Sequence, residues 1–418
     1  MSSLSPSLGR PFWTFWSAAA LANVGDGIRL AAFPLLAASL TADPVGVAAV
    51  TAGQALPWLV TGLLAGSLAD RRGARTLLVW ADTARVIVLA AVVVAVATGL
   101  ASVTLVVAAS FLLGVGETVR DTAAQTALPR LVPQRLLERA NGRLVAGEIV
   151  GNEFVGPPVG AALFVVGAAL PFAANGASLA LAVMLVLTLP LSAVAHRAAE
   201  SVAESVPVVG RGVAAGLRWL AGHRTLRTLT AVSAAVAAAD SAWFAILVLY
   251  AEKRLGTGAL GFGILLAVGA VGGLLGSFVA DRLVAGERHR AVITWSLAIT
   301  AGIPVLLAVT SRWWAAVLVI VVTSGSFAVL NVTATSLRQR TVPPDLLGRV
   351  VAASRTATLG AAALGALLGG ALATAVGVEA PFALSGLIGV AATLAWWAGA
   401  GDGTGAGDGT GGARVEEP

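Results

Sequence analysis

Asp26, Glu153 and Asp240 are three of the carboxylic acids that lie inside long apolar stretches of the chain. An ionised carboxylate at the centre of a lipid bilayer costs at least about 2.5–3.5 kcal/mol. Each of these acids therefore needs a basic partner, a water-filled cavity or a bound proton. An acid in a shared cavity could exchange a proton for a cationic compound, and this is the chemistry that the three residues predict.

The surroundings of the three acids differ. Arg29 follows Asp26 by three residues, so the two side chains share a helix face and could form an ion pair instead. Both interpretations of Asp26 stay open. Asp240 has no basic residue within one helical turn, which makes it the sharper candidate. Arg29, Glu117 and Asn331 are further candidates for the cavity, and Asn331 could equally join two helices through a hydrogen bond.

The elements that must position these residues are apolar stretches long enough to cross a membrane, which takes about 20 residues. Such stretches occur at 12–40, 45–69, 77–98, 103–125, 143–167, 171–191, 226–251, 259–280, 291–310, 313–336, 350–376 and 381–399. The sequence therefore predicts an all-α, polytopic membrane protein with twelve transmembrane helices.

The composition excludes a soluble enzyme. Of the 418 residues, 57% are hydrophobic and only 11% are charged, whereas a soluble domain has roughly 25% charged residues. The chain has no cysteine, and its three histidines are scattered without the spacing of metal ligands. We therefore expect no enzyme activity, no metal and no cofactor.

The net charge of +6 indicates topology rather than nucleic-acid binding. If the N-terminus is cytoplasmic, only Lys253, Arg254 and Arg312 fall in loops on the far side. Basic loops stay in the cytoplasm, and the first span is too long for a cleaved signal peptide. We expect a multi-pass protein of the plasma membrane with both termini cytoplasmic and no nucleic-acid partner.

The chain divides into two related halves. We predict an N-terminal six-helix bundle at 1–191, a central cytoplasmic loop at 192–225, a C-terminal six-helix bundle at 226–400 and a disordered tail at 401–418. Residues 130–139 align with residues 340–349 and share Arg, Val, Pro, two Leu and Arg at a constant offset of 210. Six spans repeated in one orientation are typical of a transporter whose halves rock about a central site.

The stretch 66–75 reads Gly-Ser-Leu-Ala-Asp-Arg-Arg-Gly-Ala-Arg. It resembles the signature that the major facilitator superfamily carries between its second and third spans, with Ala74 in place of a basic residue. A weaker copy in the second half ends in Asp281-Arg282. The resemblance covers essentially the whole chain and implies the major facilitator fold, with two pseudo-symmetric six-helix bundles.

In that superfamily the signature locks the cytoplasmic face in the outward-facing state. Physical reasoning agrees, because an Asp at the end of span two can accept hydrogen bonds from a helix N-terminus and Arg75 can reach Asp121. The resemblance implies a cytoplasmic gate formed by Gly66, Asp70, Arg71, Gly73, Arg75, Asp121, Asp281 and Arg282. The alternative for the arginines is that they only follow the positive-inside rule.

Residues 152–161 in span five resemble the antiporter signature of exporters. Gly156 and Pro157 remove a side chain and a backbone donor, so the helix can kink and approach a neighbour closely, and Gly160 follows one turn later. With 128–133 and 339–343, these residues resemble the branch that contains macrolide, multidrug and siderophore exporters. The mid-membrane arginine of the family's span-four signature has no match here.

The resulting hypothesis is a secondary active exporter of amphipathic small molecules, such as drugs or siderophore-like compounds. We expect proton antiport with alternating access, by a monomer in the lipid bilayer. The alternatives are an importer or lipid facilitator of the same fold, and a non-transporting membrane receptor or scaffold, for which no central cavity would be expected.

Overall fold

The computed structural model describes residues 8–57, 73–190, 218–284 and 289–399, and the regular structure in these ranges is helical throughout. The first half contains α1 (Gly9–Leu40), a helix at 44–57, α3 (Ala74–Ala97), α4 (Val103–Leu131), η1 (Gln134–Leu136), α5 (Leu137–Glu148), the π-helix η2 (Ile149–Val155), α6 (Gly156–Val166) and α7 (Leu170–Leu187). The second half contains a short helix at 218–222, α10 (Arg224–Phe244), α11 (Leu247–Lys253), α12 (Gly258–Val284), α13 (His289–Gly302), α14 (Val305–Val309), α15 (Trp313–Thr341), α16 (Pro344–Ala375) and α17 (Ala380–Gly399).

The predicted transmembrane architecture is confirmed. Eleven helical segments in the described ranges are long and apolar enough to cross a membrane. The twelfth predicted span, 45–69, is described as far as residue 57 and is helical to that point. The predicted tail at 401–418 and most of the predicted loop at 192–225 lie outside the described residues, so those boundaries stay predictions.

Several spans consist of more than one helical segment, and local chemistry accounts for two of the breaks. Between α13 and α14 lies Pro304, which has no backbone N–H to continue the hydrogen-bond ladder. In the fifth span, η2 has π-helical geometry directly before Gly156 and the consecutive Pro157 and Pro158. Two missing N–H donors in one turn leave carbonyls of the preceding turn without their normal partners, which is compatible with a change of helical register there.

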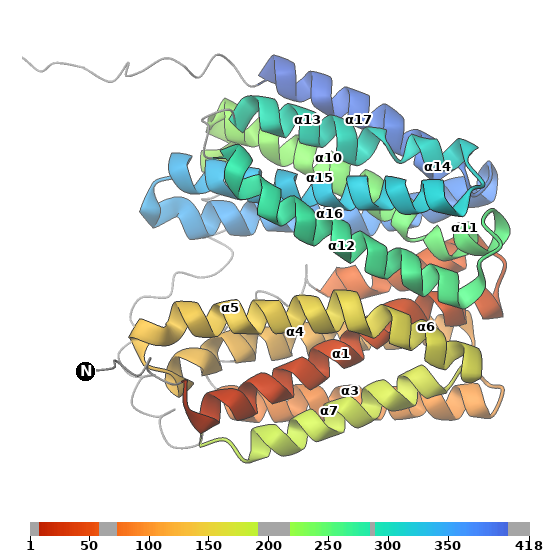
Figure 1. Ribbon diagram of the computed structural model, residues 1–418, viewed down its shortest axis with the longest axis vertical. Helices are drawn as coiled ribbons and strands as arrows, with labels where there is room; N and C mark the ends of the chain where they lie inside the picture. Colours follow the sequence, from red (N-terminus) through yellow and green to blue (C-terminus); the bar gives the residue numbers. More distant parts are fainter. Residues whose placement is uncertain (1–7, 58–72, 191–217, 285–288, 400–418) are drawn as a thin grey trace, which may run out of the picture.

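The two halves have the same internal arrangement. The bounds of α4 and α15 differ by 210 residues at both ends, which is the offset found in the sequence. In the first half α7 packs on α1 and α3, and in the second half α17 packs on α10 and α13. Figure 1 shows the two bundles one above the other, with their helices running in a common direction.

The apolar cores reveal which end of the molecule joins the halves. At the end that carries the start of α1, which we call the predicted cytoplasmic end, each half has its own buried cluster, around Phe12 in one and Trp396 in the other. At the opposite end one continuous cluster contains residues of both halves, including Phe33 and Tyr250. In the described part of the chain, the halves therefore share a core only toward the end opposite the predicted cytoplasmic one.

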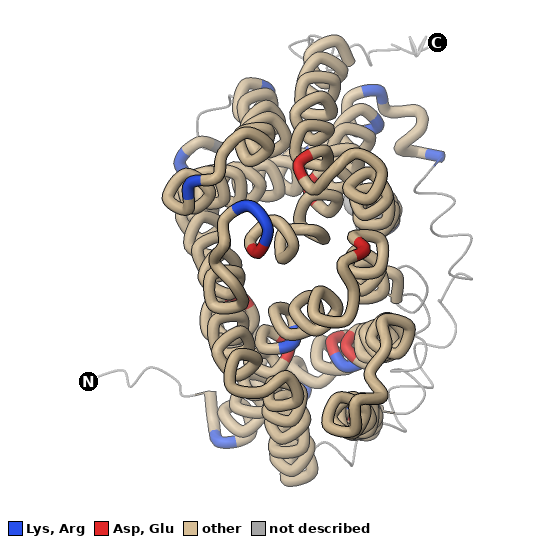
Figure 2. The backbone as a smooth tube through the Cα atoms, turned by 90° about the vertical axis from the view of Figure 1, so that its right-hand side faces the viewer, with Lys and Arg blue, Asp and Glu red and all other residues tan. Residues whose placement is uncertain are grey.

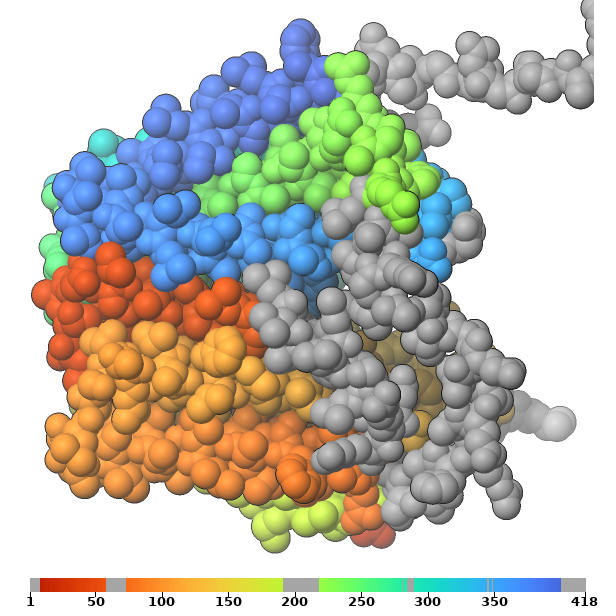
Figure 3. Space-filling view, turned by 180° about the vertical axis from the view of Figure 1, so that it is seen from behind, coloured from red at the N-terminus to blue at the C-terminus, as the bar shows by residue number. Residues whose placement is uncertain are grey.

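Close helix contacts reinforce this junction. A Cβ at Gly263 of α12 would lie 2.5 Å from Cβ of Ala161 on α6, and a Cβ at Gly370 of α16 would lie 2.6 Å from Cβ of Ala48. Figure 3 shows α16 lying along the red helix at 44–57 on the back of the molecule. The hydroxyl of Thr374 adds a 2.9 Å hydrogen bond to the Asp43 carboxylate.

Candidate functional site

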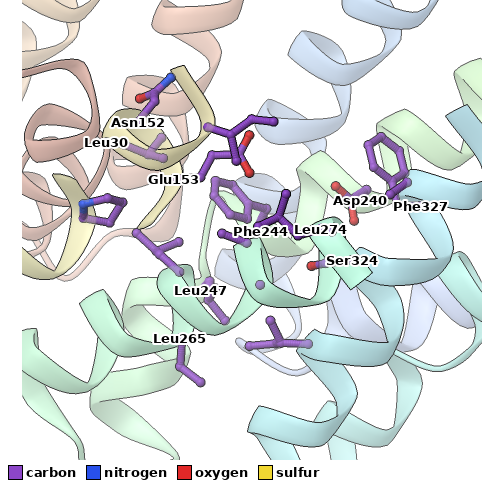
Figure 4. A pocket seen from close by; sticks show the side chains of 18 of the residues that line it. Leu30, Asn152, Glu153, Asp240, Phe244, Leu247, Leu265, Leu274, Ser324 and Phe327 are labelled. Carbon is purple, nitrogen blue, oxygen red and sulfur yellow. The ribbon is translucent and has the colours of Figure 1, made fainter. Parts of the chain in front are cut away.

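A cavity of about 460 Å³ lies between the two halves (Figure 4). The first half contributes residues of α1, η2 and α6, and the second half contributes residues of α10, α11, α12 and α15. Much of the wall is apolar, with Trp243, Phe244 and Phe327 as its aromatic members. A non-transporting receptor or scaffold was expected to have no central cavity, so the presence of this cavity argues against that alternative.

Two of the three predicted acids lie on facing walls of this cavity. Glu153 projects from η2 of the first half and Asp240 from α10 of the second half, as Figure 4 shows. No ion pair or hydrogen bond joins either carboxylate to another residue that the structure describes. Among the described residues, no Lys or Arg lines the cavity, although Arg355 lines a neighbouring pocket that also contains Asp240.

The remaining polar groups of the cavity are neutral. Asn152 lies beside Glu153 on η2, and Ser324 and Asn331 come from α15. The predicted place of Asn331 in the cavity is thus observed. An apolar wall with a few neutral hydrogen-bonding groups and two acids suits an amphipathic ligand.

The fifth span positions Glu153 through close contacts with α1. A Cβ added to Gly156 would collide with the backbone of Gly27, and one added to Gly160 would collide with the backbone of Ile28. The predicted close helix approach at Gly156, Pro157 and Gly160 is therefore observed. Because the π-helical turn η2 ends at this contact, Glu153 is held at the cavity wall by the packing of α6 on α1.

Asp26, the third acid, is not among the residues that line the cavity. It is 5% exposed and pairs with Arg85 of α3 and, at 3.6 Å, with Arg29 of its own helix. The expectation that Asp26 and Asp240 face one cavity does not hold in this structure, since Asp26 points into the first bundle. The alternative pairing with Arg29 is present.

Asp26 belongs to a buried ionic network on α1, α3 and α4. Glu117 accepts a 2.5 Å hydrogen bond from Arg29, which places both of these predicted cavity residues inside the network. Asp82 lies 3.4 Å from Arg85 and 3.1 Å from Arg120. In Figure 2, acidic and basic segments of the lower bundle lie beside one another. The seven members are Asp26, Arg29, Asp82, Arg85, Glu117, Arg120 and Asp121.

The second half has no counterpart of this network. The residues 210 positions later are Val236, Ala239, Val292, Trp295, Phe327, Leu330 and Asn331. Val236 and Leu330 belong to the apolar core around Trp396. At the positions equivalent to Asp26 and Arg120, the interior of one bundle is therefore ionic and that of the other is apolar.

The predicted cytoplasmic gate is only partly described. Gly66, Asp70, Arg71 and the side chain of Asp281 lie outside the described part of the chain. Gly73 precedes α3 with φ of 77°, a left-handed conformation that favours glycine. Arg282 is exposed near the end of α12.

The predicted contact between Arg75 and Asp121 is wrong in this structure. The guanidinium of Arg75 donates a hydrogen bond to the carbonyl of Leu187, the last residue of α7. Asp121 instead lies 3.7 Å from Arg120. The end of a helix leaves carbonyls without intrahelical donors, and α3 packs against α7, so Arg75 finds its acceptor there.

The sequence contained a signal for the network that pairwise reasoning missed. An acid is followed by an arginine three residues later on three different spans, at Asp26, Asp82 and Glu117. Each motif places two opposite charges on one helix face. Three such faces in one bundle can satisfy one another across helices, and three of the six ion pairs of the network join residues of different helices.

Comparisons with known proteins agree with this architecture. The family MFS_3, described as transmembrane secretion effector, matches residues 1–399. The chain belongs to this family of major facilitator transporters. It is 28% identical over 382 residues to a protein named multidrug efflux pump Tap from Mycolicibacterium fortuitum, covering 87% of this chain and 90% of that protein. The family identifies a multi-pass membrane transporter rather than an enzyme.

Solved structures show the same fold at low sequence identity. A point mutant of the nucleoside transporter NupG superposes with a TM-score of 0.77 at 13% identity, covering 93% of this chain and 99% of that one. A bacterial homologue of the iron transporter ferroportin, in an inward-facing state, gives a TM-score of 0.74 at 16% identity and covers 95% and 100% of the two chains. These likenesses establish the major facilitator fold.

Proposed function

We propose that this transporter exports amphipathic small molecules, such as drugs or siderophore-like compounds, in exchange for protons by alternating access. The observation that carries the proposal is the cavity between the halves, in which Glu153 and Asp240 have no described protein partner. The multidrug efflux pump with which this chain shares 28% identity supports the outward direction.

The cavity supports coupling through charge balance. An ionised carboxylate in a membrane cavity without a basic partner is costly, and a bound proton or a bound cationic group removes the cost. The two occupants then compete for the same carboxylate, so binding of one promotes release of the other. Alternating access to such a site couples their movements in opposite directions.

The apolar cores support the alternating-access part of the proposal. In the proposed orientation, both termini are cytoplasmic and the protein lies in the plasma membrane as a monomer. The halves share a core at the opposite end and have separate cores at the cytoplasmic end, which corresponds to a state closed to the outside. Export then requires breaking the packing at Gly263 and Gly370 and closing the cytoplasmic end.

The test uses inside-out membrane vesicles and a fluorescent lipophilic cation, with a proton gradient across the membrane. We expect uptake that collapses on addition of a protonophore and is abolished in Asp240→Asn and Glu153→Gln. Glu252→Gln is the matched control, because Glu252 is an exposed carboxylate at the end of the same span as Asp240. Unchanged gradient-driven uptake in both cavity variants would refute the coupling assignment.

An importer is the second candidate, because the structural neighbours include a nucleoside transporter. It predicts accumulation in right-side-out vesicles instead. Leaflet exchange of a labelled phospholipid in proteoliposomes would indicate the third candidate, a lipid facilitator.

A further inference from the structure

A second cavity lies on the first bundle, between α1 and the fifth span, and the transport proposal makes no use of it. Its volume is about 290 Å³. Figure 1 shows α1 and α5 side by side on the face of the molecule toward the viewer. The groove is lined by Trp13, Trp16, Ala20, Val24, Arg143, Ala146, Gly147, Val150 and Gly151.

This groove faces away from the central cavity. Its α1 residues, from Trp13 to Val24, recur at intervals of three or four and form one stripe of the helix. The fifth span contributes Val150 to the groove and Asn152 and Glu153 to the central cavity, and these sets share no member. Trp13 is 41% and Val150 53% exposed, in spans that cross the membrane, so the groove opens toward lipid.

The groove ends at Arg143, which contacts the aromatic rings of Trp13 and Trp16. The guanidinium of Arg143 lies 4.9 Å from the centre of the Trp13 ring, and the indole of Trp16 donates a 2.9 Å hydrogen bond to the Arg143 carbonyl. No hydrogen bond or ion pair joins the guanidinium to any residue that the structure describes. The buried Arg29, Arg85 and Arg120 all have carboxylate partners. Arg143 thus presents hydrogen-bond donors above an apolar groove, and none of the described residues accepts from them.

We propose that this groove binds one anionic phospholipid of the bilayer, with an acyl chain along the groove and the phosphate on Arg143. Trp13 and Val24 are separated by about 16 Å along α1 at the usual rise, close to the roughly 15 Å depth of one leaflet's hydrocarbon. Gly147 and Gly151 leave room for the chain beside α1. Tryptophan and arginine at the end of a span suit the headgroup level.

The charge around Arg143 favours an anionic headgroup over a zwitterionic one. Arg139 lies one turn earlier on α5 and therefore on the same side as Arg143, and it is exposed. The carboxylate in this turn, Glu138, precedes Arg143 by five residues and points to a different side of the helix. A lipid with net negative charge gains attraction from both arginines, whereas a zwitterionic lipid carries its own cation into the same field.

The internal duplication sets the stoichiometry. The positions 210 residues after Trp13, Trp16 and Arg143 are His223, Leu226 and Ala353. The second bundle therefore lacks the arginine and the two tryptophans at the corresponding positions. One anionic lipid per chain is expected at this type of site.

The test is native mass spectrometry of the full chain, purified from bilayers with equal amounts of phosphatidylglycerol and phosphatidylcholine. We expect one phosphatidylglycerol to persist through delipidation of the wild-type protein. Arg143→Gln should retain it about fivefold less well, while Arg143→Lys should keep most of the retention. Arg218→Gln is the control, because Arg218 is an exposed arginine at the same end of the second bundle.

Two results would overturn the proposal. One is equal retention of the two lipids by the wild-type chain, which needs no variant and so does not depend on how a variant folds. The other is phosphatidylglycerol retention in Arg143→Gln that equals that of the Arg218→Gln control. The readout is bound lipid rather than transport, so failure here leaves the export proposal intact, and the reverse also holds.

Discussion

Asp82 holds the centre of the buried network, and its replacement by asparagine tests whether the network stabilises the first bundle. The Asp82 carboxylate lies 3.1 Å from Arg120 and 3.4 Å from Arg85, and its side chain is 1% exposed. The Asp82→Asn substitution keeps the shape of the side chain and removes its charge. Arg85 would keep Asp26 as a partner, whereas Asp121, at 3.7 Å, would be the one described carboxylate left to Arg120.

The expected loss follows from burial. Removing one partner of a buried ion pair costs about 3–5 kcal/mol, because the other charge stays buried without compensation. We expect the lower end, about 3 kcal/mol, because Arg85 remains paired. For a cooperative unit the size of one bundle this lowers the melting temperature by roughly 6–12 °C. The matched control is Asp240→Asn, which removes a carboxylate without a described partner and should leave the melting temperature unchanged.

Thermal unfolding of the detergent-solubilised protein, followed by size-exclusion of the surviving fraction, measures both variants. The double variant Asp82→Asn/Arg120→Gln separates an ionic effect from loss of packing. It removes both charges of one pair, so we expect it to melt above Asp82→Asn alone, with a coupling energy of about 1–3 kcal/mol. A melting temperature of Asp82→Asn equal to that of Asp240→Asn, or strictly additive single losses, would refute the reasoning.

Two further predictions concern glycines at helix contacts. Gly156→Ala places a Cβ against the Gly27 backbone and should cost about 1–3 kcal/mol of stability; the control Gly142→Ala, with nothing within 4 Å, should be neutral or stabilising. Gly263→Ala should weaken the junction of the halves and increase labelling, from the side opposite the predicted cytoplasmic end, of a single cysteine placed in the cavity of this cysteine-free chain. Gly273→Ala, also without neighbours within 4 Å, is its control, and equal labelling of the two variants would contradict the assignment of this contact.

The architecture was predictable because lipid imposes strong constraints on sequence. A span needs about 20 apolar residues, and the predicted stretch 313–336 lies within the observed α15 at Trp313–Thr341. The 210-residue offset that appears in the Arg-Val-Pro segments recurs in the bounds of α4 and α15. The π-helical turn η2 was not predicted, since sequence periodicity over seven residues cannot distinguish helical registers.

The surroundings of a site residue were predictable where they depend on its own helix. They were not predictable where side chains of several helices meet. Asp240 has no basic residue within one helical turn, and the structure adds none as a direct partner among the described residues. Asp26 also looked like a cavity acid, yet Arg85 reaches it from α3. That contact depends on the rotation of two helices about their axes, which the pattern of one helix does not specify. Neutralising Asp26 is therefore expected to lower the stability of the first bundle, and any effect on transport is expected to follow from that loss.

The two bundles differ in how their acids are paired. The first bundle contains a network of buried ion pairs, and the second places Asp240 in the cavity without a described ion-pair partner. Ion pairs among α1, α3 and α4 are costly to break singly, so we expect the first bundle to move as a unit. The second bundle has the apolar residues Val236 and Leu330 at the positions of Asp26 and Arg120. Its one described cavity acid, Asp240, lines the cavity with Trp243 and Phe244. No described residue forms an ion pair with Asp240. We therefore expect a charge change at Asp240 to alter the conformational equilibrium between the halves directly. Val236 and Ala239 lie 210 positions after Asp26 and Arg29. Replacing them with Asp and Arg would introduce buried charges at a place where the equivalents of Asp82, Arg85 and Glu117 are Val292, Trp295 and Phe327 and offer no charged partner.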